Sequence, residues 1–264
     1  MTESEMENNG SEAEVSRRLH FEWVLPLFFR PRRTLQAVAR QTIGVWWVPL
    51  LLLSLAAVAA ALAGGPARLQ AAQMGATLPQ DFQYYSPEMQ AQFTKALEMQ
   101  QGPVYIYIFP ALGALLGVWV QWFLLAALLH LALTLSGSRS SSSTSFNLAA
   151  WASLPFLIGF LVQAVYLLST GQLITAPGLA GFASADGVGL SAVARPFLGV
   201  VDLYWIWHIV LLLIGAVDSS GTSRLKTVVV VLTVVLLVWV LRALPGILAA
   251  RLSSMPVTQP FFFY

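Results

Sequence analysis

The chain has 264 residues, of which 57% are hydrophobic and only 10% are charged, and its formal net charge is +2. Soluble domains carry about 25% charged residues, so this composition excludes a water-soluble globular protein and indicates an integral membrane protein. The small net charge gives no support to nucleic-acid binding. With no cysteine and three scattered histidines, the sequence predicts no disulfide, no metal site and no cofactor.

Residues 1–42 precede the first apolar run, and we expect them to form a cytoplasmic tail followed by an interfacial helix. The first 16 residues are acidic and polar, which is typical of a disordered terminus. An amphipathic helix is predicted after Thr34, which can act as its N-cap, with Leu35 and Val38 on its apolar face. The alternative is a simple extension of the first membrane span. Four basic side chains are the candidate anchor to an anionic membrane surface: Arg30, Arg32, Arg33 and Arg40.

Residues 43–250 contain five apolar runs, each long enough to cross a hydrocarbon core of about 30 Å as a helix. The expected fold is all-α: a polytopic membrane helix bundle with five transmembrane helices and the preceding interfacial amphipathic helix. The runs lie at about 43–63, within 104–135, at 146–169, and in a last hairpin, 197–248, whose polar turn is 218–226. Residues 251–264 are then a short extracytoplasmic tail.

The longest polar loop, residues 64–103, contains one clear helix signal. Ser86 can cap a helix that begins with Pro87 and Glu88, and Gly102 can end it. We expect this short amphipathic helix to lie on the outer membrane surface or to cap the bundle, and a ligand-binding lid is the alternative.

Three residues within the spans predict how helices bend and pack. Gly113 and Gly117 form a GxxxG pair in the second run, which permits close approach of another helix. Pro155 lies inside the third run and should kink it, because proline removes one helix hydrogen bond.

Four polar side chains interrupt the apolar runs and form two candidate pairs. Gln121 and Gln163 fall at similar depth, so a hydrogen bond between them would satisfy both amides in lipid. Asp202 and Arg242 lie symmetrically about the last turn and are candidates for an intramembrane ion pair. The alternative places Arg242 and Asp202 at the interface, with Asp202 near the positive end of its helix. A proton relay from Asp202 to His208 is a third interpretation.

The distribution of basic residues predicts the orientation. With five spans and a cytoplasmic N-terminus, nine Lys and Arg residues lie inside and four outside, with Arg242 in the last span. This satisfies the positive-inside rule, so we expect the N-terminus in the cytoplasm and the C-terminus outside.

Three stretches resemble the Ypt-interacting protein (Yip) family, and its bacterial branch in particular: FRPRRTLQAVAR, AAWASLPFLIGFL, and VDLYWIWHIVLLLIGAV with its short basic turn. The resemblance implies a five-span membrane protein with a cytoplasmic N-terminus and a scaffold-like or accessory role, since eukaryotic members associate with Rab-type GTPases and vesicle transport. Those members carry Asp-Leu-Tyr-Gly-Pro before the first span. Here Asp202-Leu203-Tyr204 lies in the fourth run and continues to Trp205, which removes the support for GTPase binding.

The expected function is that of a non-enzymatic membrane adaptor or scaffold, because paired acids, a His-rich motif or a Ser–Lys dyad are missing. Its expected partners are the lipid bilayer and another membrane protein, with a homo-oligomer also permitted and nucleic acid excluded. The alternative function is a small transporter or channel that uses Asp202, His208 and Arg242. The bacterial cytoplasmic membrane is the expected location, and a eukaryotic endomembrane is the alternative.

Overall fold

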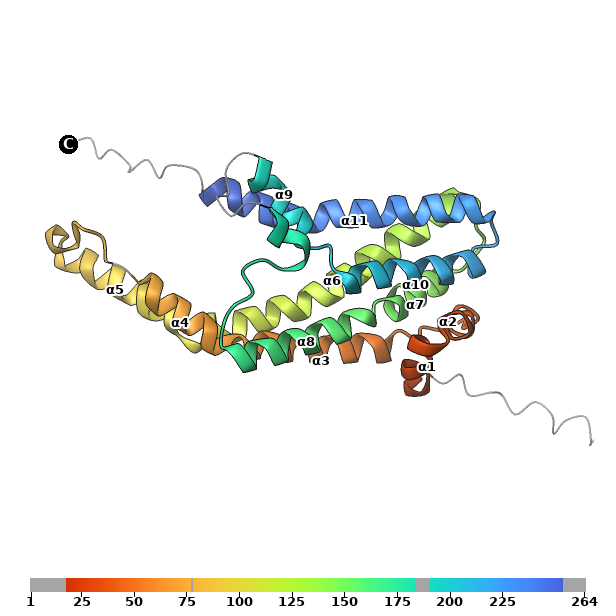
Figure 1. Ribbon diagram of the computed structural model, residues 1–264, viewed down its shortest axis with the longest axis horizontal. Coiled ribbons are helices and arrows are strands. Elements are labelled where there is room, and N and C mark those ends of the chain that lie inside the picture. The colour runs from red at the N-terminus through yellow and green to blue at the C-terminus, as the bar shows by residue number, and fades with distance from the viewer. Residues whose placement is uncertain (1–17, 77, 184–189, 254–264) are drawn as a thin grey trace, which may run out of the picture.

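The computed structural model describes residues 18–76, 78–183 and 190–253, so the acidic tail and most of the segment 251–264 lie outside the described residues. The secondary structure of the described residues is helical throughout (Figure 1). The α-helices are α1 (Val24–Phe29), α2 (Pro31–Ala39), α3 (Trp47–Ala63), α4 (Gly65–Gly75), α5 (Pro87–Gln101), α6 (Phe109–Leu135), α7 (Ser142–Ala152), α8 (Pro155–Thr170), α9 (Leu190–Leu198), α10 (Leu203–Ser219) and α11 (Arg224–Ser253).

Several helical stretches of the described chain are suited to a bilayer. Four of them are long and apolar enough to cross a membrane, and they span Trp47–Gly75, Val104–Leu135, Ser142–Thr170 and Arg224–Leu248. α10 is apolar but has only 17 residues, about 26 Å at 1.5 Å per residue. The all-α membrane bundle is therefore confirmed, and a fifth crossing, by α10, stays a prediction.

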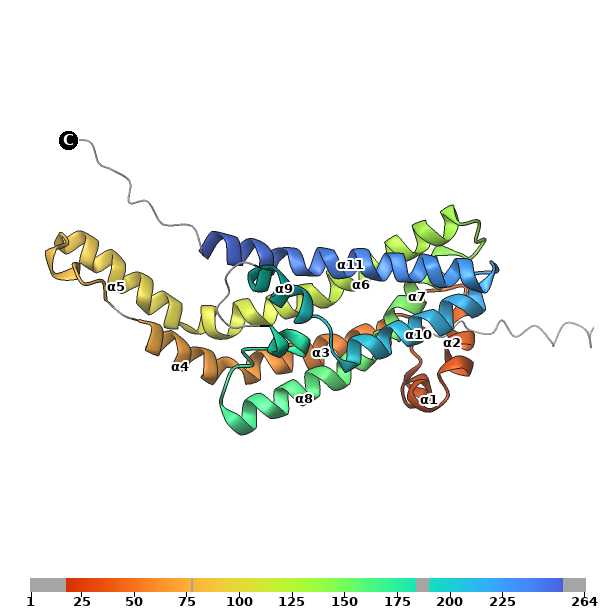
Figure 2. The ribbon, with the colours of Figure 1, turned by 45° about the horizontal axis from the view of Figure 1, so that its top comes forward.

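The long helices lie side by side, and their connections alternate between the two ends of the bundle (Figures 1 and 2). α2, the turn 136–141 and the turn 220–223 gather at one end, which we call the arginine end. There the hydroxyl of Ser138 donates a hydrogen bond to the carbonyl of Ser220 at 2.6 Å and joins the two turns. α4 and α5 project from the opposite end, which we call the arm end.

α2 is amphipathic, but it begins earlier than the sequence predicts. Pro31 occupies its first turn, where the missing N–H costs nothing, so Thr34 is not the N-cap. Instead the Thr34 hydroxyl lies inside the helix and donates to the carbonyl of Arg30 at 3.2 Å. Leu35 and Val38 are buried, and α2 contacts α7 and α10. The apolar face of α2 therefore packs on protein rather than on lipid, and its arginines are left on the outside.

The apolar stretch that contains Pro155, where the sequence predicts a kink, is divided into two helices. α7 ends at Ala152 and α8 begins at Pro155, although both belong to one apolar stretch. Across the break, the backbone N–H of Phe156 bonds to Ser153 instead of reaching the carbonyl four residues back. The carbonyl of Ala152 is thus released from the helix ladder.

The predicted GxxxG contact is not made within the described chain. A Cβ added at Gly113 or Gly117 would meet nothing within 4 Å, because this face of α6 points away from the bundle, as exposed Leu116 does. Close approaches occur at other glycines. A Cβ on Gly215 of α10 would lie 2.6 Å from Leu148 of α7, and one on Gly159 would lie 2.9 Å from the ring of Tyr204.

The segment predicted as a polar loop with one helix contains two. α5 is capped as expected, since the Ser86 hydroxyl accepts from the Met89 N–H at 3.3 Å and Gly102 ends the helix. α4 was not predicted, and it continues α3 beyond Gly64. Together α4 and α5 form a helical arm that leaves the bundle (Figure 1).

Candidate functional site

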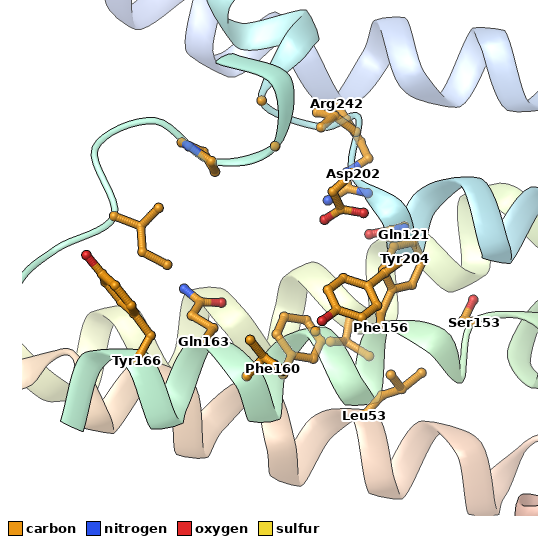
Figure 3. A pocket seen from close by; sticks show the side chains of 18 of the residues that line it. Leu53, Gln121, Ser153, Phe156, Phe160, Gln163, Tyr166, Asp202, Tyr204 and Arg242 are labelled. Atoms are coloured by element: carbon orange, nitrogen blue, oxygen red, sulfur yellow. The ribbon is translucent and has the colours of Figure 1, made fainter. Parts of the chain in front are cut away.

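A cavity of about 710 Å³ lies between α8 and α11. Its floor comes from α3 and α6, and segments near residues 174–178 and 199–202 line its other side (Figure 3). Much of the wall is apolar, with Leu53, Phe156 and Phe160 among the lining residues. Its polar lining includes Gln121, Gln163, Tyr166, Asp202, Tyr204 and Arg242. The four side chains singled out within the apolar runs, two amides and two charged groups, therefore share one site.

Asp202 reaches the cavity as the N-cap of α10. Its Oδ1 accepts a hydrogen bond from the backbone N–H of Trp205 at 2.7 Å, which satisfies one of the free N–H groups of the first turn. Asp202 is therefore just outside the apolar helix and at its positive end, as the interfacial interpretation expects. Among the described residues, Oδ2 has no hydrogen-bond partner.

Arg242 enters the cavity from α11, and Figure 3 shows it beside Asp202. It lies in the second half of α11, nine residues before Arg251. Neither predicted direct pair is formed among the described residues: Asp202 and Arg242 are not joined by an ion pair within 4 Å, and Gln121 and Gln163 are not hydrogen bonded to each other. These four groups face a shared space instead, in which they are available to a ligand.

His208 lies outside the cavity lining and has a structural partner. Its side chain is 3% exposed, and Nδ1 lies 2.8 Å from the carbonyl of Ala152, the group released at the Pro155 break. The imidazole also packs on the ring of Phe156, with 5.1 Å between centroids. A neutral imidazole with its proton on Nδ1 satisfies the carbonyl, so the geometry does not favour a relay through His208.

The family model of the Yip1 domain matches residues 26–244 of the chain, from α1 into α11. The chain belongs to the Yip1 domain family. No curated protein and no solved structure matches it. The match includes α2, the break at Pro155 and all of the residues that line the cavity. It confirms the resemblance to the Yip family noted in the sequence.

This Yip1 domain also contains a polar clasp that the sequence did not predict. The buried amide of Asn147 accepts from the N–H of Val45 at 2.8 Å and donates to the carbonyl of Ile43 at 2.9 Å. One turn later, the indole N–H of Trp151 donates to the carbonyl of Val45 at 3.0 Å. α7 thereby satisfies the irregular backbone between α2 and α3. The available signal was an asparagine one turn before a tryptophan in an otherwise apolar helix.

A second unpredicted contact joins α2 to the last turn of α10. Asp218, which follows the apolar part of α10, accepts from Arg32 Nε at 3.0 Å and Nη2 at 3.1 Å, and from Gln36 at 3.0 Å. Hydrogen bonding by Arg32 holds the pKa of Asp218 below its ordinary value, and Asp218 raises the pKa of Arg32. Arg32 thus has a partner within the domain, whereas Arg30, Arg33 and Arg40 are exposed at the same end.

Proposed function

We propose that this Yip1-domain protein is a non-enzymatic membrane adaptor that holds another membrane protein through the arm formed by α4 and α5. The observation that carries the proposal is the arm itself, which leaves the bundle as a helical hairpin (Figures 1 and 2). Its helices contact each other, the end of α3 and the π-helical turn Val104–Ile108 that precedes α6. Most of the described side chains of the arm are exposed or half-buried.

The surface of the arm is suited to recognition. Large side chains on it are exposed, including Met74 at 71%, Tyr84 at 80%, and Met89 and Met99 at 52% and 50%. Methionine is flexible and polarisable, and tyrosine offers a large apolar ring with a polar tip, so both occur often at binding surfaces. Such a surface supports contact with a protein at the membrane boundary.

The base of the arm is held in a defined direction. Arg68 of α4 donates to the carbonyl of Ala61 near the end of α3 at 2.7 Å, and to the carbonyl of Ile106 before α6 at 3.2 Å. Gly65 allows the ring of Tyr107 to lie against α4, where any larger side chain would collide with it. A fixed base supports an adaptor because it presents the arm in one orientation at little entropic cost on binding.

The proposed topology has five crossings, with α10 as the fourth. It places the arginine end in the cytoplasm and the arm outside, in agreement with the excess of basic residues on the cytoplasmic side. The exposed side chains of Arg30, Arg33 and Arg40 then face an anionic leaflet. We propose a bacterial cytoplasmic membrane as the location, with a eukaryotic endomembrane as the alternative.

The test is photo-cross-linking in native membranes, followed by mass spectrometry. Cross-linkers at Met89 and Met99 report on the arm, and a cross-linker at Leu116, on the outward face of α6, is the matched control. We expect a stoichiometric protein partner from both arm positions and only lipid from Leu116. If the arm yields no protein, or only a second copy of this chain, the adaptor proposal is wrong in this form.

The cavity favours a small transporter as the second candidate function, because it gathers Asp202, Arg242 and two amides within the bundle. Flux measurements in liposomes separate this candidate from the adaptor. Substrate flux that disappears in Arg242→Gln and persists in Lys95→Gln would favour transport. Lys95 is the control because it is exposed on the arm.

A further inference from the structure

We propose that the cavity between α8 and α11 binds the zwitterionic headgroup of an ethanolamine phospholipid, with the phosphate at Arg242 and the ammonium at Asp202. This site is separate from the arm, so the inference does not depend on the adaptor proposal. A membrane-embedded charge costs about 2.5–3.5 kcal/mol on insertion scales, and Arg242, which has no direct ion pair among the described residues, is therefore a candidate to bind an anionic group.

The arrangement of the two charged side chains in the cavity supports a ligand that carries both charges. Arg242 and Asp202 are neighbours at one side of the cavity (Figure 3), and they form no direct ion pair within 4 Å among the described residues. A ligand with both charges can satisfy both residues at once. The planar guanidinium is suited to two oxygens of a phosphate, and Asp202 Oδ2 is free to accept from an ammonium group.

Polar side chains of α8 and α10 also line the cavity. Gln163 and Tyr166 project toward the cavity from α8, and Tyr204 follows Asp202 in the first turn of α10 (Figure 3). Amide and phenol groups donate hydrogen bonds to phosphate and ester oxygens, and amide oxygens accept from ammonium. The site therefore offers further hydrogen-bond donors beside the guanidinium.

The position of Arg242 along α11 and the apolar walls of the cavity suit a lipid. Arg242 lies in the half of α11 nearer to the arm end, nine residues before Arg251. Val162 of α8 lines the cavity and is 53% exposed, so the site is continuous with the apolar outer surface of α8. Apolar walls such as Leu53 and Phe160 suit acyl chains. A volume of about 710 Å³ holds a headgroup and the upper part of the chains.

Hydrogen bonding to Asp202 favours ethanolamine over the other headgroups. Ethanolamine carries an ammonium with three N–H donors, whereas the quaternary ammonium of choline has none to offer Asp202. Phosphatidylglycerol has the phosphate but no cation. A soluble zwitterion, such as an amino acid or free phosphoethanolamine, shares the charges but lacks the chains that the apolar walls would bury.

The experiment is native mass spectrometry of the full chain released from nanodiscs that contain equal parts of phosphatidylethanolamine, phosphatidylcholine and phosphatidylglycerol. We expect the wild type to retain phosphatidylethanolamine and Arg242→Gln to retain about tenfold less of it, since the charge-assisted bonds to phosphate are lost. Asp202→Asn keeps an oxygen for the helix cap but replaces Oδ2 with an NH2 group, so it should lose the preference over both phosphatidylcholine and phosphatidylglycerol. Lys95→Gln removes a basic residue of the arm and should bind like the wild type.

Two further measurements make the outcome decisive. Gln163→Ala changes an exposed cavity side chain and should weaken retention even if a charge variant fails to fold. Soluble phosphoethanolamine and amino acids are added as competitors. Equal retention of the three lipids, or unchanged retention in Arg242→Gln and Gln163→Ala, overturns the proposal. Displacement by a soluble zwitterion at submillimolar concentration overturns the lipid source and assigns the site to a solute.

Discussion

Asn147 of α7 accepts a hydrogen bond from the backbone N–H of Val45 at 2.8 Å, and both residues are fully buried. The segment that contains Val45 leaves α2 and enters α3 without helical hydrogen bonds of its own. In an apolar bundle, each such backbone group needs a partner, because no water replaces it. The Asn147 side chain therefore helps to fix where the N-terminal helices join the bundle.

Replacing Asn147 with leucine should destabilise the domain by about 1–3 kcal/mol, because the N–H of Val45 and the carbonyl of Ile43 both lose their partner. Thermal unfolding in detergent micelles measures the loss. Thr233→Val is the control, since that hydroxyl is exposed and bonds only within its own helix. Equal unfolding temperatures for Asn147→Leu and the wild type would show that the clasp contributes nothing to stability.

The contact between Arg32 and Asp218 should make the docking of α2 sensitive to acid. The pKa of Asp218 is lowered in the folded protein, so its stabilising effect is complete above the ordinary carboxyl pKa and is lost as the pH falls through the lowered value. Between pH 5 and pH 8 this contact should add no pH dependence. Both groups are charged throughout that range.

A double-mutant cycle isolates this contact from the other arginines. Arg32→Gln and Asp218→Asn should each loosen α2, and their effects should not add at pH 7, because either change removes the same ion pair. The coupling between them should disappear in strong acid. Arg33→Gln, an exposed neighbour in α2, should show no coupling with Asp218→Asn. Additive effects of the first pair at pH 7 would contradict the contact.

The elements that could be predicted from sequence are those with strictly local causes. Ser86 caps α5, Pro155 ends α7, and long apolar runs become long helices, since capping, ring geometry and hydropathy act within a few residues. Asp202 and Arg242 could be singled out because charges are rare in apolar runs. Their common cavity could not be predicted, because it depends on the tilt and rotation of α8 and α11.

Other parts of the structure depend on contacts with residues distant in the sequence, and local sequence patterns indicate them only weakly. α4 was missed because its composition is mixed, with no clear apolar face to distinguish it from a loop. The packing of α2 on α7 and α10 could not be separated from packing on lipid, since both bury the same apolar face. In the sequence, Gly215 and Gly117 look equally suited to helix contact. Only the fold shows that Leu148 lies against Gly215.

His208 should act in folding rather than in proton transfer. His208→Ala leaves the carbonyl of Ala152 without a donor at a break where the helix ladder cannot supply one, and about 1–3 kcal/mol of stability should be lost. His208→Gln can restore a donor and should recover part of the loss. Thermal unfolding measures both variants. Proton flux in liposomes that requires His208, in a variant of unchanged stability, would contradict this structural role.

The same substitution should destabilise the bundle at Gly215 and have little effect at Gly117. Gly215→Val places new atoms against Leu148, which is 1% exposed and has no room to move, so overpacking should cost about 1–3 kcal/mol. Gly117→Val meets open space on the outer face of α6 and should change stability by less than about 0.5 kcal/mol.

Combining Gly215→Val with Leu148→Ala should recover part of the lost stability, because the smaller side chain makes room for the larger one. Unfolding in detergent measures the three variants, and size-exclusion chromatography reports their oligomeric state. If Gly117→Val dissociates an oligomer while leaving the monomer folded, then the GxxxG face binds a second copy instead of lipid. If Leu148→Ala recovers none of the stability lost in Gly215→Val, contact with Leu148 is not the cause of that loss.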